Sequence, residues 1–190
     1  GDGLNKNDML TATATDSSNN TSEFGPNFQV TTISPFTSVV RADQLSNALT
    51  GQGVTVAVVD SGITTQHPDF TVSSTDTNSR VIASTKFGNN LTTEDAYGHG
   101  THVAGIIGSN GSASSGSYKG VAPKVNLINV KTSDANGMTY ESDVVDGLQW
   151  IYNNKSTYNI KVVNISMNST VAQSYHTSPL DAAVEILWFN

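Results

Sequence analysis

The sequence predicts an α/β fold with a mainly parallel sheet, because strand-like and helix-like patterns alternate along most of its length. The clearest strand is the unbroken run Val-Thr-Val-Ala-Val-Val at residues 54–59, of the kind that lies buried in a parallel sheet. Between such runs the apolar residues follow a helical period. A chain of 190 residues is long enough for one domain with a sizeable core, and short for two.

The elements after the first strand are predicted in alternation. The last two helical patterns have apolar residues at i, i+3 and i+4 spacing, which gives each helix one apolar face for packing. The further strands are predicted at residues 80–87, 126–131 and 161–166, and the helices at residues 99–108, 139–153 and 178–189.

The N-terminal region has a different character. Residues 1–35 contain few apolar side chains, no periodicity and two prolines, which predicts an extended arm or a linker left by a removed pro-segment. The first residue is Gly1, and we expect a processed or trimmed end. Residues 36–190 then form the main domain. Apolar residues within 39–49 predict one face of a short helix, ended by Gly51-Gln-Gly53.

Composition excludes several kinds of partner. Nine basic and sixteen acidic residues give a net charge of −7, which disfavours nucleic acid or an anionic membrane as the main partner. There is no cysteine, so neither disulfides nor thiol chemistry contribute. No apolar stretch approaches the roughly 20 residues of a membrane helix.

Asp60 is the first candidate for chemistry. It follows the buried strand directly, and the carboxyl ends of parallel strands are where open α/β sheets bind ligands. The alternative interpretation is an ordinary turn or cap aspartate, since Ser61 and Gly62 follow it.

His99 is the second candidate. Glycines on both sides of it let the backbone turn tightly and let another segment approach closely. At the start of a helix the dipole disfavours a charged imidazole, which suits a general base. A metal site with His102 is the alternative, but no further ligands follow at matching spacing. We expect His102 to be a structural residue that forms hydrogen bonds in the core.

Taken together, these segments resemble the subtilisin-like serine protease (subtilase) family, and the resemblance implies that residues 36–190 are the N-terminal part of its catalytic domain. The two principal motifs are VAVVDSGI at residues 56–63 and HGTHVAG at residues 99–105, with Asp60 and His99 separated by 39 positions. The resemblance covers about residues 38–190 and includes Gly120-Val-Ala-Pro123 and Val162-Val-Asn-Ile-Ser166.

The resemblance implies a three-layer α/β/α fold, incomplete in this chain, and hydrolysis of peptide bonds in proteins by an Asp-His-Ser triad. Asp60 would orient His99, and His99 would take the proton of the serine. It also implies a secreted or cell-surface protease that acts on protein or peptide substrates without a cofactor for the chemistry.

The family binds its substrate as an extended strand between two backbone segments. The matching residues here are Gly137, Met138 and Thr139 on one side and Ser166, Met167 and Asn168 on the other. The family usually has Gly where Asn168 stands, so Asn168 adds a side chain where the substrate backbone passes.

Two features of the family pattern are missing. No Gly-Thr-Ser-x-Ala motif and no Ala-Gly-Asn segment occur, so the nucleophilic Ser and the oxyanion-stabilising Asn are expected beyond residue 190 or on a second chain, the C-terminal remainder of the domain. This chain alone is then expected to be inactive. The alternative is a subtilase-fold structural or surface component without activity.

A calcium ion is an option that the resemblance also raises. Asp69 matches one calcium ligand of the family, whereas the loop at residues 108–119 contains no carboxylate. One carboxylate does not make a calcium site.

Overall fold

The computed structural model describes residues 9–10, 28–29, 35–45, 48–168 and 173–190. In the N-terminal arm it describes two short strands, β1 (Met9–Leu10) and β2 (Phe28–Gln29), which pair antiparallel. The rest of residues 1–34 lies outside the described residues, so the arm and the domain boundary near residue 35 stay predictions.

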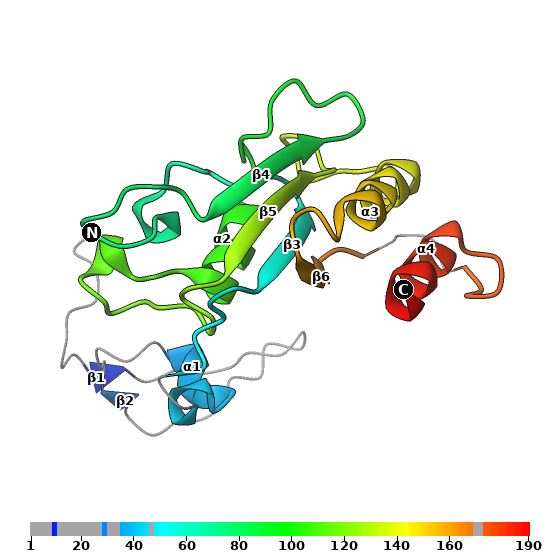
Figure 1. The fold of residues 1–190 in the computed structure, drawn as a ribbon. Coiled ribbons are helices and arrows are strands. Elements are labelled where there is room, and N and C mark those ends of the chain that lie inside the picture. Colours follow the sequence, from blue (N-terminus) through cyan, green and yellow to red (C-terminus); the bar gives the residue numbers. More distant parts are fainter. Residues whose placement is uncertain (1–8, 11–27, 30–34, 46–47, 169–172) are drawn as a thin grey trace, which may run out of the picture.

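A parallel sheet of four strands, in the order β4-β5-β3-β6, forms the centre of the fold (Figure 1). Every neighbouring pair in it is parallel, as the alternation of strands and helices predicted. The predicted α/β class is therefore confirmed. The strands are β3 (Thr55–Asp60), β4 (Val81–Lys86), β5 (Asn126–Lys131) and β6 (Ile160–Ile165).

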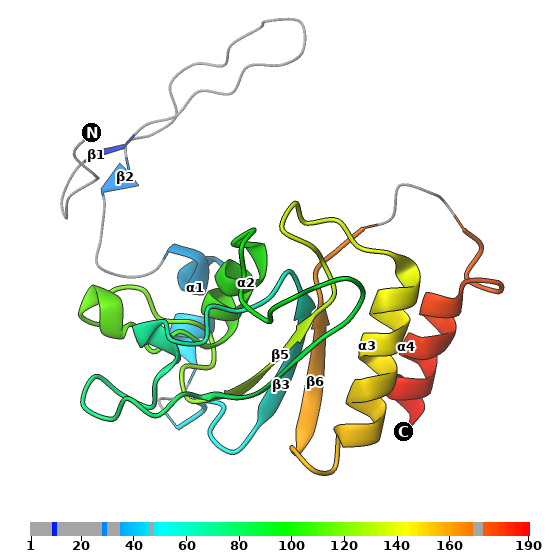
Figure 2. The ribbon, with the colours of Figure 1, turned by 90° about the horizontal axis from the view of Figure 1, so that it is seen from above.

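Helices cover both faces of the sheet and make three layers. The helix α2 (His99–Gly108) packs on one face, and α3 (Glu141–Asn154) packs on the other. The helix α4 (Pro179–Phe189) lies beside α3 on the same side of the sheet (Figure 2). Ser178 caps α4, because its side chain accepts a hydrogen bond from the Asp181 amide.

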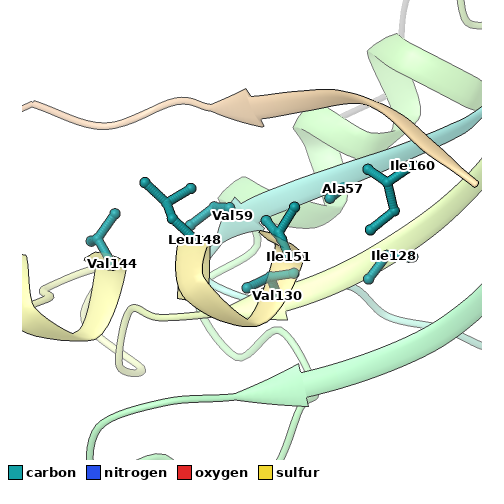
Figure 3. Close-up of a cluster of buried hydrophobic side chains, with 8 residues drawn as sticks. All are labelled: Ala57, Val59, Ile128, Val130, Val144, Leu148, Ile151 and Ile160. Carbon is teal, nitrogen blue, oxygen red and sulfur yellow. The ribbon is translucent and has the colours of Figure 1, made fainter. Parts of the chain in front are cut away.

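The burial of strand β3 shows that both faces of the sheet are covered. All six of its residues are buried, and successive side chains point to opposite faces. Ala57 and Val59 pack under α3, in the cluster that Figure 3 shows, and Val56 and Val58 pack under α2. Each fully buried valine contributes about 1.5–3 kcal/mol relative to an exposed one.

The predicted helix at residues 39–49 is wrong. The structure has a five-residue helix α1 (Pro35–Val39) and then a separate 3₁₀ turn (Ala42–Gln44). Arg41 stands between them at φ 58°, a left-handed conformation that a continuing helix does not allow. The expected apolar face is also exposed, since Val39 is 81% and Leu49 62% accessible.

Apolar side chains are exposed along β6 and α4. Val162 on β6 is half exposed, and Trp188 and Phe189 on α4 are 83% and 73% exposed. Among the described residues β6 pairs only with β3 and forms the edge of the sheet. Within those same residues, no helix is both long and apolar enough to cross a membrane.

Candidate active site

A cleft of about 560 Å³ opens at the carboxyl ends of the strands. We call it the strand-end cleft. Strands β3 and β6 end at it with Asp60 and Ile165, and Ser133 reaches it from just beyond β5. Strands β3 and β5 are neighbours in the sheet. After β3 the next strand is β4, at one edge, and after β5 the next strand is β6, at the other edge. The cleft therefore lies at the point where the strand order reverses, which is where open α/β sheets bind ligands. Further lining residues are Tyr97, His99, Glu141, Leu180 and Asp181.

Asp60 and His99 meet at this cleft. The Nδ1 atom of His99 lies 2.7 Å from Oδ1 of Asp60. The carboxylate is 4% exposed, whereas the imidazole is 44% exposed. The acid is therefore enclosed by protein, and the ring above it is open to the cleft.

This contact fixes the roles of the two ring nitrogens. A carboxylate only accepts hydrogen bonds, so Nδ1–H of His99 is the donor of this hydrogen bond and Oδ1 of Asp60 is the acceptor. The other nitrogen, Nε2, is then an acceptor in a ring that lines the cleft. An oriented imidazole of this kind can take a proton from a hydroxyl group brought within hydrogen-bond reach.

The start of α2 is held by side chains outside the helix. Asp95 accepts hydrogen bonds from the amides of Gly98 (2.7 Å) and Thr101 (2.8 Å). The Ser61 hydroxyl accepts one from the Gly100 amide (2.9 Å). These bonds satisfy amides that have no partner within the helix, and they hold His99 at its first position. Sequence reasoning missed Asp95, although an acidic residue just before a helix was a signal for it.

Asp95 provides a test at acid pH. Burial raises its pKa, but hydrogen bonds from Thr101, Gly98 and Ser61 outweigh burial and hold the pKa below the usual 3.8. A carboxyl whose pKa is depressed on folding adds stability above its unfolded value, and this stability is lost as the pH falls through the folded value. We expect Asp95→Asn to be less stable than the wild type at pH 7, with a difference that narrows below pH 3.8. Urea unfolding at pH 7 and at pH 3 measures both; an equal difference at the two pH values contradicts the prediction.

Two glycines let the end of β3 and the start of α2 approach closely. A Cβ at Gly100 would overlap the carbonyl oxygen of Gly62 and lie 3.1 Å from the Asp60 side chain. A Cβ at Gly62, where φ is 117°, would meet the carbonyl oxygens of Thr93 and Glu94 at 2.9 Å. Glycine is therefore required on both sides of the Asp60–His99 contact.

Gly137, Met138 and Thr139 form one wall of the cleft. Their turn is closed on itself: Asp134 accepts hydrogen bonds from the Met138 amide through its side chain, and the Met138 carbonyl accepts one from the Asp134 amide. The hydrogen bond from the Met138 amide, together with one from the Asn136 amide, lowers the pKa of the Asp134 carboxyl. The backbone groups of Met138 are thus paired within the turn, and its side chain is exposed.

Ser166, Met167 and Asn168 form the opposite wall. They continue β6, the edge strand, beyond its last residue. Ser166 accepts a hydrogen bond from the Asn164 side chain, and Asn168 is exposed. The two predicted segments therefore face the same cleft as Asp60 and His99.

The expectation for His102 is wrong. Its side chain is exposed on α2, so it forms no part of the core. The period of the helix explains the result, since Ala104 and Gly108 on another face of α2 are the buried residues. Across the portion of the chain that the structure describes, no three His, Asp or Glu side chains are arranged to hold a metal ion.

The surroundings of Asp69 do not fit a calcium ion. Its two carboxylate oxygens accept hydrogen bonds from the Ser109 hydroxyl (3.0 Å) and the Ala113 amide (2.7 Å). The buried guanidinium of Arg80 lies beside it and binds the carbonyl oxygens of Asp69 and Gly108. A calcium site needs six to eight oxygen ligands that are free to face the ion. Here Ser109 and Ala113 bond to the Asp69 carboxylate oxygens, and Arg80 bonds to the nearby backbone carbonyl oxygens.

Comparison with known proteins gives the family. The model of the Subtilase family matches residues 51–188, and the chain belongs to this family. The solved structure of a cold adapted subtilisin-like serine proteinase is similar with a TM-score of 0.53 and 29% identity, over 74% of this chain and 44% of that chain. The predicted subtilisin-like fold is thereby confirmed.

Individual relatives match over a similar range. Serine protease AprX of Bacillus subtilis (strain 168) is 39% identical over 156 residues, which is 79% of this chain and 33% of that protein. Subtilisin E of the same strain is 34% identical over 148 residues, 77% of this chain and 35% of that protein. The chain thus spans about a third of the length of these two relatives.

Proposed function

We propose that this chain supplies the Asp-His part of the Asp-His-Ser triad of a serine endopeptidase that hydrolyses peptide bonds in proteins. Asp60 and His99 are its catalytic residues here. The nucleophilic Ser and the oxyanion-stabilising Asn lie on sequence beyond residue 190 or on a second chain. The observation that carries the proposal is the 2.7 Å contact between a buried carboxylate and an open imidazole.

The geometry defines what each group does. As the serine oxygen attacks the carbonyl carbon of the peptide bond, Nε2 of His99 takes its proton, and Asp60 stabilises the imidazolium through Nδ1. The imidazolium then gives that proton to the leaving amine as the carbon–nitrogen bond breaks. Water, deprotonated by the same ring, hydrolyses the acyl-enzyme and restores the serine. Without the serine this chain alone performs none of these steps.

The substrate in this proposal is an extended peptide. The walls at Gly137–Thr139 and Ser166–Asn168 support it, because they flank the cleft that contains His99. An extended peptide can add to an edge strand through main-chain hydrogen bonds, which tolerate varied sequences. In this proposal the Asn168 side chain, which is exposed and lines the cleft, lies where the peptide would pass.

The remainder of the catalytic domain is the proposed partner. The edge position of β6 supports this, because an exposed apolar edge strand favours pairing with a further strand. The exposed Trp188 and Phe189 on α4 add apolar surface for such a partner. A secreted or cell-surface location belongs to the same proposal and rests on family membership alone.

Labelling with a fluorophosphonate tests the function. The complete protein, or this chain together with its C-terminal partner, is treated with the probe and analysed by mass spectrometry. We expect one covalent adduct, on a serine outside residues 1–190, and no adduct when His99 is replaced by alanine. Folded material that takes up no probe contradicts the proposal and favours the inactive scaffold.

A further inference from the structure

Ser61 connects the two halves of the candidate site. It is 1% exposed, and every one of its polar groups is paired. Its amide donates to Oδ1 of Asp60 (2.7 Å), the same oxygen that His99 contacts. Its hydroxyl donates to Asp95 (2.8 Å) and accepts from the Gly100 amide (2.9 Å), and its carbonyl accepts from the Lys131 ammonium.

These bonds tie separate elements together. Ser61 follows the last residue of β3, and Gly100 is the second residue of α2, next to His99. Asp95 holds the Ser61 hydroxyl and, through the amides of Gly98 and Thr101, the first turn of α2. Ser61 thus links the end of β3, which carries Asp60, to the start of α2, which carries His99.

Lys131 holds the other side of Ser61. It is the last residue of β5, pairs in register with Asp60, and is only 4% exposed. Burial lowers its pKa, and the carboxylates of Asp95, Asp134 and Asp60 partly offset that effect. A charged group enclosed in this way does not reach the strand-end cleft, and its hydrogen bond goes to the Ser61 carbonyl.

We infer that Ser61 is a positioning residue for the proposed triad, fixed in place by Asp95 and Lys131, and that it sets the geometry of the Asp60–His99 hydrogen bond. The inference rests on the proposed protease function. Ser61 would act through Asp60 and His99, since its described contacts include neither the reacting atoms nor the imidazole.

Removing the hydroxyl has a definite consequence. In Ser61→Ala the buried amide of Gly100 loses its acceptor and Asp95 loses a donor. The first turn of α2 can then move relative to β3, and His99 moves with it. A misplacement of about 1 Å in a catalytic group lowers the rate about 10²-fold.

NMR of the His99 ring tests this without any activity. A proton on Nδ1 held by a carboxylate gives a sharp signal far downfield, which is lost when the hydrogen bond loosens and the proton exchanges with water. We expect this signal in the wild type and its loss in Ser61→Ala. The matched control is Ser109→Ala, because Ser109 is also buried, donates to a carboxylate and accepts from an amide, and lies away from His99. The signal is expected to remain there.

Two outcomes overturn the inference: a Ser61→Ala signal identical to that of the wild type, or its equal loss in Ser109→Ala. If Ser61→Ala does not fold, Lys131→Met provides the second variant, since it leaves the serine in place and removes the bond to its carbonyl together with the buried charge near Asp60, Asp95 and Asp134. A weakened His99 signal in folded Lys131→Met supports the inference, and an unchanged one contradicts it.

Kinetics separate the inference from the proposed function. In the complete protein we expect Ser61→Ala to lower kcat about 10²-fold with KM within about twofold, and Ser109→Ala to leave both unchanged. A wild type without protease activity whose His99 signal depends on Ser61 contradicts the function and supports the positioning role. An active wild type whose kcat is insensitive to Ser61→Ala contradicts the positioning role alone.

Discussion

Replacing His99 with alanine is expected to lower kcat about 10⁶-fold in the complete protein. That magnitude was measured in a subtilisin, a relative of this chain, and it sets the expectation here. The physical reason is that His99 acts as the general base in the proposed function. Its Nδ1 atom lies 2.7 Å from the buried Asp60 carboxylate, and no other basic side chain among the described residues forms a hydrogen bond with that carboxylate. Hydrolysis of a peptide amide substrate under saturating conditions measures kcat directly.

A matched control separates chemistry from folding. His176 is exposed in a turn and does not line the cleft, so His176→Ala is expected to retain the wild-type kcat. Asp60→Asn should lower kcat about 10⁴-fold, because the ring loses its orienting carboxylate. If His99→Ala retains more than a hundredth of the wild-type rate, the assignment of His99 as the general base is wrong.

The parts of the fold that follow a simple period were predictable. Strand β3 was clear because both faces of the sheet are covered, so every residue of the run is apolar or small. Helix α3 was clear because Val144, Leu148 and Ile151 recur on one face. Asp60 and His99 were found as separate motifs, and only the structure establishes that their side chains touch.

The parts that depend on contacts between distant residues were not predictable. The periodicity of residues 39–49 favoured a helix, but Arg41 in a left-handed conformation interrupts it. Nothing in the sequence indicated that Ser61, Asp95 and Lys131 converge, because 34 positions separate Ser61 from Asp95 and 70 separate it from Lys131. Such polar convergence has no period, and a buried lysine looks like any other in a sequence.

Arg80 is the clearest case of a residue whose role appears only in three dimensions. It directly precedes β4, and its side chain is 4% exposed. Burial lowers its pKa, and the charge of Asp69 partly restores it. Its guanidinium donates to four backbone carbonyls on three separate segments of the chain. These are the carbonyls of Thr71, Val125, Asp69 and Gly108, at 2.6–2.8 Å.

Arg80→Leu is therefore expected to lower the free energy of unfolding by about 3–5 kcal/mol, since it leaves several buried carbonyls without donors. Arg80→Lys should recover little of this loss, because one ammonium cannot replace a planar fork that reaches four acceptors. The exposed Lys119 on the neighbouring loop gives the control, and Lys119→Leu should change stability by no more than about 0.5 kcal/mol. Guanidinium unfolding of the complete protein, with EDTA and with added Ca²⁺, measures all three variants. The arginine account requires that Ca²⁺ not restore Arg80→Leu; full restoration by the ion, or wild-type stability without it, contradicts the account.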